Sequence, residues 1–142
     1  MKRLSLTLLL AIFCAPIAHS ENSTVAEEKQ VREASQKLLS AKEFTIGKVG
    51  EAGDQSPVEV SFRALLKCPE ALAECQKLVS DASPAGQLYG LLGLKILDAN
   101  AFQAALPRFN DSKIPVMTMA GCIVFKTTAG DIAKDIEQGK IE

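Results

Sequence analysis

Apolar residues recur at helical spacing over most of the chain, and prolines with small polar residues divide it into short segments. The run Ser56-Pro57-Val58-Glu59 is typical of a helix start, with serine at the N-cap, proline at the first helical position and glutamate at the third. We predict that this helix continues to about residue 67. Its buried face should hold Val60, Ala64 and Leu65 or their neighbours.

Two further pairs with proline predict two more helix starts. Cys68-Pro69 opens a segment that should be helical to about residue 81, and Ser83-Pro84 opens one that should be helical to about residue 98. Asp98 can cap a short helix that ends at about Leu106, before Pro107. The helix over 69–81 has apolar positions at helical spacing: Leu72, Cys75, Val79 and Ala82.

The segment 84–97 is apolar on nearly every side, so we expect it at the centre of the fold with neighbours on several sides. Each of its glycines costs roughly 1 kcal/mol relative to alanine, and close approach of neighbouring helices is the simplest compensation. These glycines are Gly86, Gly90 and Gly93. Tyr89 should pack in the same core, with its hydroxyl hydrogen-bonded to a partner.

The two ends of the chain add one helix each. Ser23 or Thr24, followed by Glu27, resembles a capping box that opens an N-terminal helix over residues 25–42. A glycine-rich loop, residues 45–55, joins it to the next helix. Near the C-terminus, Thr128 caps a last helix that should end before Gly139.

A change of pattern after residue 112 predicts a small β-hairpin near residues 115–126. The runs 116–119 and 122–125 are rich in β-formers and flank Ala120-Gly121. The fold class is therefore mainly α, and α+β is the alternative. The spacing of the proline-led helices resembles short stacked helical hairpins of the HEAT type, and a compact bundle would give the same pattern.

Residues 1–20 have the pattern of a cleaved signal peptide. Lys2 and Arg3 precede an apolar run, and small residues at 18 and 20 place the cleavage site between Ser20 and Glu21. We therefore expect a periplasmic or secreted bacterial protein, with residues 21–142 forming a single helical domain. Lipidation of Cys14 is disfavoured, because bulky Phe13 stands where a lipoprotein signal has a small residue.

The composition excludes several functions but does not identify one. The 142 residues are 47% apolar and 23% charged, which excludes wholesale disorder, and a net charge of −1 provides no basic patch for nucleic acid. Both Lys2 and Arg3 and the only histidine, His19, lie in the signal peptide, so residues 21–142 carry 14 basic and 17 acidic residues, a net charge of −3. Without histidine, nucleophile activation by a Ser-His-Asp or Cys-His arrangement is unavailable. We expect no cofactor and no metal site.

Three cysteines remain after the signal peptide, namely Cys68, Cys75 and Cys122. An oxidising compartment favours a disulfide. Cys68 and Cys75 would be about 10 Å apart on one helix, beyond the limit of about 7 Å for a disulfide. We therefore predict a bond from Cys75 to Cys122, with Cys68 as the alternative partner. Otherwise Cys68 is a free thiol at a helix start, where its thiolate would be stabilised.

Two other groups of residues are weaker candidates for a site. Glu70 with Glu74, and Asp131 with Asp135, are paired carboxylates at i, i+4, which we interpret as solvated helix surface.

Glycine recurs every three residues at Gly47, Gly50 and Gly53, in the connection between the first two helices. We interpret this segment as a flexible, turn-rich connection. The alternative is a mobile recognition loop.

These observations favour an exported, non-enzymatic helical protein-interaction module, with another exported protein as its partner. Nucleic acid is not an expected partner, and residues 21–142 contain no expected integral membrane segment. One alternative is an inhibitor or immunity-type protein that blocks a cell-wall-directed enzyme. Another is a thiol- or carboxylate-dependent enzyme that uses Cys68 or the acidic pairs, which the missing histidine disfavours.

Overall fold

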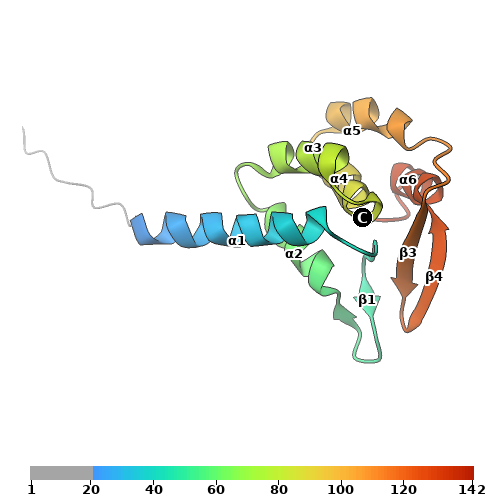
Figure 1. Ribbon diagram of the computed structural model, residues 1–142, viewed down its shortest axis with the longest axis horizontal. Helices are drawn as coiled ribbons and strands as arrows, with labels where there is room; N and C mark the ends of the chain where they lie inside the picture. The colour runs from blue at the N-terminus through green and yellow to red at the C-terminus, as the bar shows by residue number, and fades with distance from the viewer. Residues whose placement is uncertain (1–20) are drawn as a thin grey trace, which may run out of the picture.

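Helices make up most of the chain in the computed structural model, which describes residues 21–142 (Figure 1). The predicted signal peptide, with Cys14 and Ser20, lies outside these residues. Six helices are present in the described part: α1 (Glu21–Leu39), α2 (Pro57–Leu65), α3 (Ala71–Asp81), α4 (Pro84–Leu97), α5 (Ala99–Ala105) and α6 (Ala129–Glu137). A short 3-10 turn, Leu106–Arg108, follows α5. The prediction of a mainly α fold with a small β-hairpin is confirmed.

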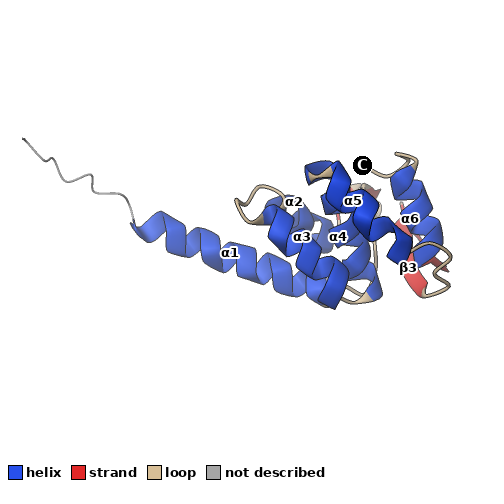
Figure 2. Cartoon of the chain, turned by 90° about the horizontal axis from the view of Figure 1, so that it is seen from above, coloured by secondary structure: helices blue, strands red, loops and turns tan. Residues whose placement is uncertain are grey.

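The helices pack around α4, which contacts α1, α3, α5 and α6. The α1 helix lies against α2, and its N-terminal part extends away from the body of the molecule (Figure 2). The described residues also form two antiparallel strand pairs: β1 (Lys48–Val49) with β2 (Asp54–Gln55), and β3 (Pro115–Ala120) with β4 (Ile123–Thr128). The β3–β4 hairpin projects from the helices near α6, as Figure 1 shows.

Local capping explains why most helix starts were predictable. The side chains of Ser56, Ser83 and Thr128 accept hydrogen bonds from backbone N–H groups three residues later, at 3.0, 3.2 and 3.1 Å. Asp98 caps α5 in the same way, through the N–H groups of Asn100 and Ala101. Each of these bonds needs only residues within one helical turn.

Two predicted helix starts are wrong. Residues 66–70 form turns, so α3 begins at Ala71 after an N-cap at Glu70 instead of at Pro69. The first helix begins at Glu21 and ends at Leu39, which places Ser23 and Thr24 inside it and not at its N-cap.

The centre of the fold confirms the role predicted for the α4 glycines. A Cβ atom at Gly90 would lie 2.8 Å from the Cys75 carbonyl oxygen and 2.8 Å from the Val79 nitrogen, so α3 and α4 meet backbone to backbone. At Gly93 a Cβ would overlap the Cys75 sulfur. The close packing of α3 on α4 therefore requires glycine at both positions.

The buried face of α2 agrees with the prediction at Leu65 and differs from it at Val60. Val60 is 52% exposed, whereas Glu59, Phe62 and Leu65 are buried. Glu59 also differs from a standard capping box, because its carboxylate accepts the Gly47 N–H and does not return to the N-cap. A charged residue can take the buried position only because it has hydrogen-bond partners there.

The β3–β4 turn is one residue later than expected. Ala120 pairs with Ile123, so Gly121 and Cys122 are the two loop residues. Gly121 has a φ of +58°, and a positive φ at the first loop residue favours glycine.

The contact of Gly93 with Cys75 gives a test of the core packing. We expect Gly93→Ala to lower the free energy of unfolding by about 1–3 kcal/mol, because the added methyl group overlaps the Cys75 sulfur. In a Cys75→Ala background the same substitution should cost clearly less. Urea unfolding of both single variants and the double variant measures the coupling. Additive effects would show that this contact does not limit the packing.

Candidate interaction surface

The chain that follows α1 is bound to α4 by two side chains. The Ser83 hydroxyl donates to the Ala41 carbonyl at 2.6 Å, and the Ser83 N–H donates to the Leu39 carbonyl. Farther along α4, the Tyr89 hydroxyl donates to the Thr45 carbonyl at 2.8 Å and accepts the Thr45 N–H at 3.0 Å. Tyr89 is fully buried, and this burial raises its pKa to about 12. The predicted core position and hydroxyl partner of Tyr89 are therefore confirmed.

Glu59 fixes the next part of this segment. Its carboxylate accepts the Gly47 N–H at 2.9 Å and contacts the Arg63 guanidinium at 3.4 Å. Arg63 in turn donates to the backbone carbonyl of Glu142 at 2.9 Å, so the C-terminus joins the same network. Because Glu59 is 1% exposed, these partners compensate for the burial of its charge. Glu59 thus connects α2 to the start of the β1–β2 hairpin.

The three candidate glycines lie in or beside this small hairpin. Gly47, Gly50 and Gly53 all have positive φ values, of +98°, +70° and +66°. The Gly47 N–H is bonded to Glu59, and the Gly50 N–H donates to the Gly121 carbonyl at 2.9 Å. The recognition role considered for these glycines stays a prediction, but the segment is connected by hydrogen bonds to both α2 and the tip of β3–β4.

One edge of the β3–β4 hairpin is covered by this segment. The Phe44 N–H donates to the Met117 carbonyl at 2.9 Å, and single bridges join Glu43 to Met117 and Val49 to Gly121. Pro115, at the start of β3, has no N–H to offer at this edge. The outer edge of β3 is therefore closed by residues 43–50.

The opposite edge, on β4, is open. Along an antiparallel pair, the backbone groups of successive residues point alternately toward and away from the partner strand. The carbonyls of Met117 and Gly121 point away from β4, so the odd-numbered residues of β3 do the same. Lys126 lies opposite Met117, and Val124 lies opposite Met119. The backbone N–H and C=O of Val124 and Lys126 therefore point outward, and in the part of the chain that is described nothing pairs with them.

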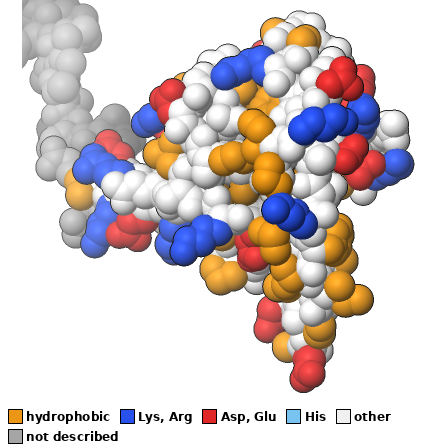
Figure 3. Space-filling model, turned by 45° about the vertical axis from the view of Figure 1, so that its right-hand side comes forward, with side chains coloured by type: hydrophobic (Ala, Val, Ile, Leu, Met, Phe, Trp, Pro, Cys, Tyr) orange, Lys and Arg blue, Asp and Glu red, His pale blue; other side chains and the backbone are white. Residues whose placement is uncertain are grey.

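Apolar side chains are exposed on both faces of the same hairpin. Ile123 and Phe125, on one face, are 70% and 45% exposed, and Val124, on the other, is 48% exposed. Met117 shares the face of Val124 and is also exposed. Figure 3 shows these orange side chains gathered along the projecting hairpin. We refer to the open edge and these side chains of Met117 and Ile123–Phe125 as the β4 surface.

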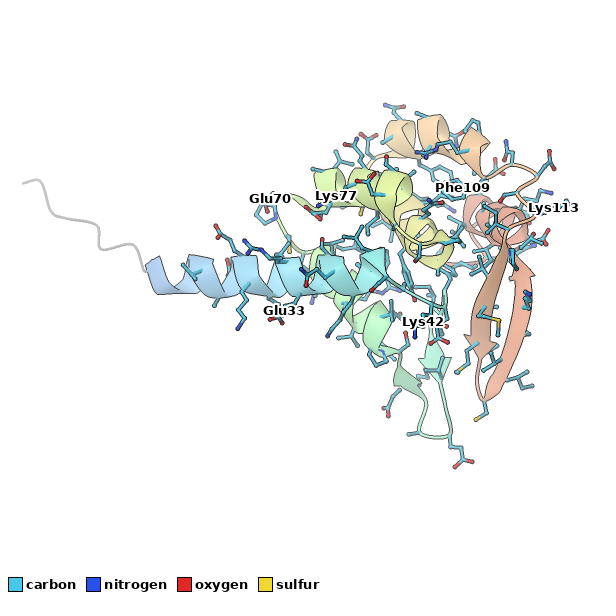
Figure 4. The ribbon with its side chains drawn as sticks, viewed as in Figure 1. Glu33, Lys42, Glu70, Lys77, Phe109 and Lys113 are labelled. Carbon is cyan, nitrogen blue, oxygen red and sulfur yellow. The ribbon has the colours of Figure 1, made fainter. Side chains whose placement is uncertain are left out.

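The hairpin segment itself carries little charge, and that charge is positive. Residues 112–128 contain two lysines and no acidic residue. Lys126 is the one charged residue within β4, and Lys113 precedes β3 at the base of the hairpin (Figure 4). Charged side chains commonly protect exposed strand edges, and β4 has little of this protection.

A second surface feature is a groove of about 1090 Å³ between α1 and the connection from α2 to α3. Glu70 and Lys77, labelled in Figure 4, lie on its α3 side. The Ser35 hydroxyl on α1 donates to the Glu74 carboxylate across it. Acidic and basic residues are mixed along the groove, and this mixture indicates no particular ligand.

The predicted disulfide is wrong. Cys68, Cys75 and Cys122 are all free. Cys75 is fully buried between α3 and α4, whereas Cys122 is exposed in the turn of the projecting hairpin. The prediction assumed that the apolar residues around Cys75 and those around Cys122 belong to one core. The β3–β4 hairpin instead places Cys122 away from the helices.

Neither Cys68, which is half-buried, nor Cys75, which is buried, has the lowered pKa of a reactive thiol. Burial raises the pKa of the Cys68 thiol, and the nearby carboxylates of Glu70, Glu27 and Glu74 raise it further. Burial raises the pKa of Cys75 to about 12. The thiolate stabilisation expected at Cys68 is therefore wrong, because the residue precedes the N-cap of α3 and lies among acidic side chains.

The acidic pairs have ordinary structural roles. Asp131 accepts a hydrogen bond from the Thr128 hydroxyl at the start of α6, and Asp135 pairs with Lys140 at 3.0 Å. Glu70 is exposed, and Glu74 is half-buried and accepts a hydrogen bond from the Ser35 hydroxyl. Among residues 21–142, no three potential metal-ligating side chains are grouped.

Comparisons with protein families, with curated proteins and with solved structures find no significant match for this chain. Within residues 21–142, none of the helices has the length and apolar character needed to cross a bilayer.

Sequence reasoning did not find the buried Glu59 or the open edge of β4. Glu59 was placed only in a local capping box, since its partner Gly47 lies twelve residues away. The three consecutive apolar residues Ile123–Phe125 were a usable signal, because a strand with one solvated face alternates apolar and polar residues.

The three thiols should differ in reactivity. Cys122 should react first with a neutral thiol reagent, because it is exposed, and Cys68 should follow more slowly because its pKa is raised. Cys75 should react only after unfolding. Peptide mapping of the folded, reduced protein against time measures the order. Rapid labelling of Cys75 in the folded protein would contradict the packing of α3 on α4.

Proposed function

We propose that this chain is an exported, non-enzymatic protein-interaction module and that the β4 surface is its contact site. The observation that carries the proposal is the combination of an unpaired strand edge with apolar side chains on both faces of one projecting hairpin. Natural proteins usually protect such edges, because they pair readily with other chains. An exposed apolar group of this kind is typical of a binding site.

The interior of the protein supports a binding role more than a catalytic one. The thiols of half-buried Cys68 and fully buried Cys75 have raised pKa values. The carboxylate of buried Glu59 is bonded to the Gly47 N–H and to Arg63. The thiol-dependent alternative would need a lowered pKa at Cys68, and the surroundings of this residue act in the opposite direction.

Two valines of nearly equal exposure provide a matched test. Val124 on β4 is 48% exposed, and Val60 on α2 is 52% exposed. Figure 1 shows α2 on the opposite side of β1 from the β3–β4 hairpin. We expect Val124→Gln to weaken binding of a partner from periplasmic extract about fivefold, because loss of one apolar contact costs about 1 kcal/mol. Val60→Gln should leave binding unchanged.

Retention of the partner on immobilised protein, titrated against the free protein, measures both affinities. The melting temperatures of the two variants should stay close to that of the unchanged protein, since both positions are on the surface. The proposal would be refuted by an equal loss of binding in both variants, or if the chain bound no stoichiometric partner at all, a second copy of itself included.

A further inference from the structure

We propose that the open edge of β4 pairs with β4 of a second copy of this chain, to give a weak two-fold dimer. This inference rests on the proposed function, because it assigns a partner to the same surface. The backbone groups of Val124 and Lys126 point outward and are open to an added antiparallel strand, which can bond to one or both of these residues.

Geometry leaves three two-fold registers within the outer part of β4. The outward groups of one copy must meet outward groups of the other, so the two-fold axis passes through Val124, Phe125 or Lys126. An axis at Lys126 places two lysines directly opposite each other, which is destabilising. An axis at Phe125 places each Val124 opposite a lysine.

The axis at Val124 gives the best match of side chains. Val124 then lies opposite its own copy, and Ile123 lies opposite Phe125 in both directions. Cross-strand pairs between aromatic and β-branched residues are favourable. Lys126 lies opposite uncharged Cys122, a loop residue of the other copy, so no like charges are opposed and the two Val124 residues form the hydrogen-bonded pair. The strand is therefore complementary to itself in one register.

The same arrangement closes the sheet. Residues 43–50 cover the outer edge of β3, and β2 is only two residues long, so neither offers a long edge for further addition. A pair of copies thus uses the one extended open edge and does not grow into a filament.

The dimer should be weak. One strand pair covers less than the about 800 Å² per partner that is typical of a stable interface. We expect a dissociation constant between about 1 μM and 1 mM. Sedimentation equilibrium of the unmodified, reduced protein should show a dimer fraction that rises with concentration in this range.

Disulfide trapping tests the register. In a Cys122→Ser background, Val124→Cys places two thiols on the two-fold axis, with Cα atoms about 5.5 Å apart, which permits a disulfide. Cys122 of the unchanged chain is offset by four residues from its copy, about 13 Å along the strand, and should not cross-link. Diamide should therefore give a covalent dimer from Val124→Cys at least tenfold faster than from Cys122→Ser alone.

Val60→Cys, also in the Cys122→Ser background, is the matched control and should cross-link no faster than that background. The inference is overturned if the unmodified protein stays monomeric up to about 1 mM. It is also overturned if Cys122 cross-links in preference to Val124→Cys. If the protein is monomeric while Val124→Gln still weakens partner binding, the proposed function stands and the β4 edge binds a strand of another protein.

Discussion

The two hydrogen bonds between the Tyr89 hydroxyl and the backbone of Thr45 determine how the strands are arranged on the helices. They bind the segment that follows α1 to α4, which is buried along most of its length. Ser83 holds the same segment at the start of α4. The Thr45 N–H and C=O both bond to the hydroxyl of one rigid side chain. This segment therefore has a fixed position, from which it can reach β3. The β-structure is thus attached to the helical core at a few specific points.

This attachment makes the two edges of the β3–β4 hairpin unequal. Residues 43–50 reach the outer side of β3 through the bonds of Phe44 and Gly50, and no corresponding segment of the described chain reaches β4. An edge strand normally has charges, a proline or a covering element. β3 has the proline and the cover, while β4 has Lys126 alone beside three exposed apolar residues. The contrast within one hairpin supports a functional interpretation of the open edge.

Sequence reasoning succeeded where a structure depends on neighbouring residues and failed where it depends on distant ones. The starts of α2, α4 and α6 follow from Ser56, Ser83 and Thr128, whose capping bonds lie within one turn. The Cys75–Cys122 disulfide was wrong because the direction of the hairpin depends on contacts with residues 43–50, which no local pattern encodes. Val60 was predicted to be buried because hydrophobicity was the only criterion, whereas Glu59 takes that place through the Gly47 N–H.

One edge of the β3–β4 hairpin is closed by the chain itself, and the other edge is open in the described residues. Amide hydrogen exchange tests this difference between the two edges most directly. The exchange is run below about 1 μM protein, where a weak dimer is dissociated, and after quenching the remaining amide protons are measured by NMR. We predict protected amides at Phe44, Gly50 and Phe125, which donate within the described structure, and unprotected amides at Val124 and Lys126. Protection of Val124 and Lys126 equal to that of Phe125, or rapid exchange at Phe44 and Gly50, would contradict the account.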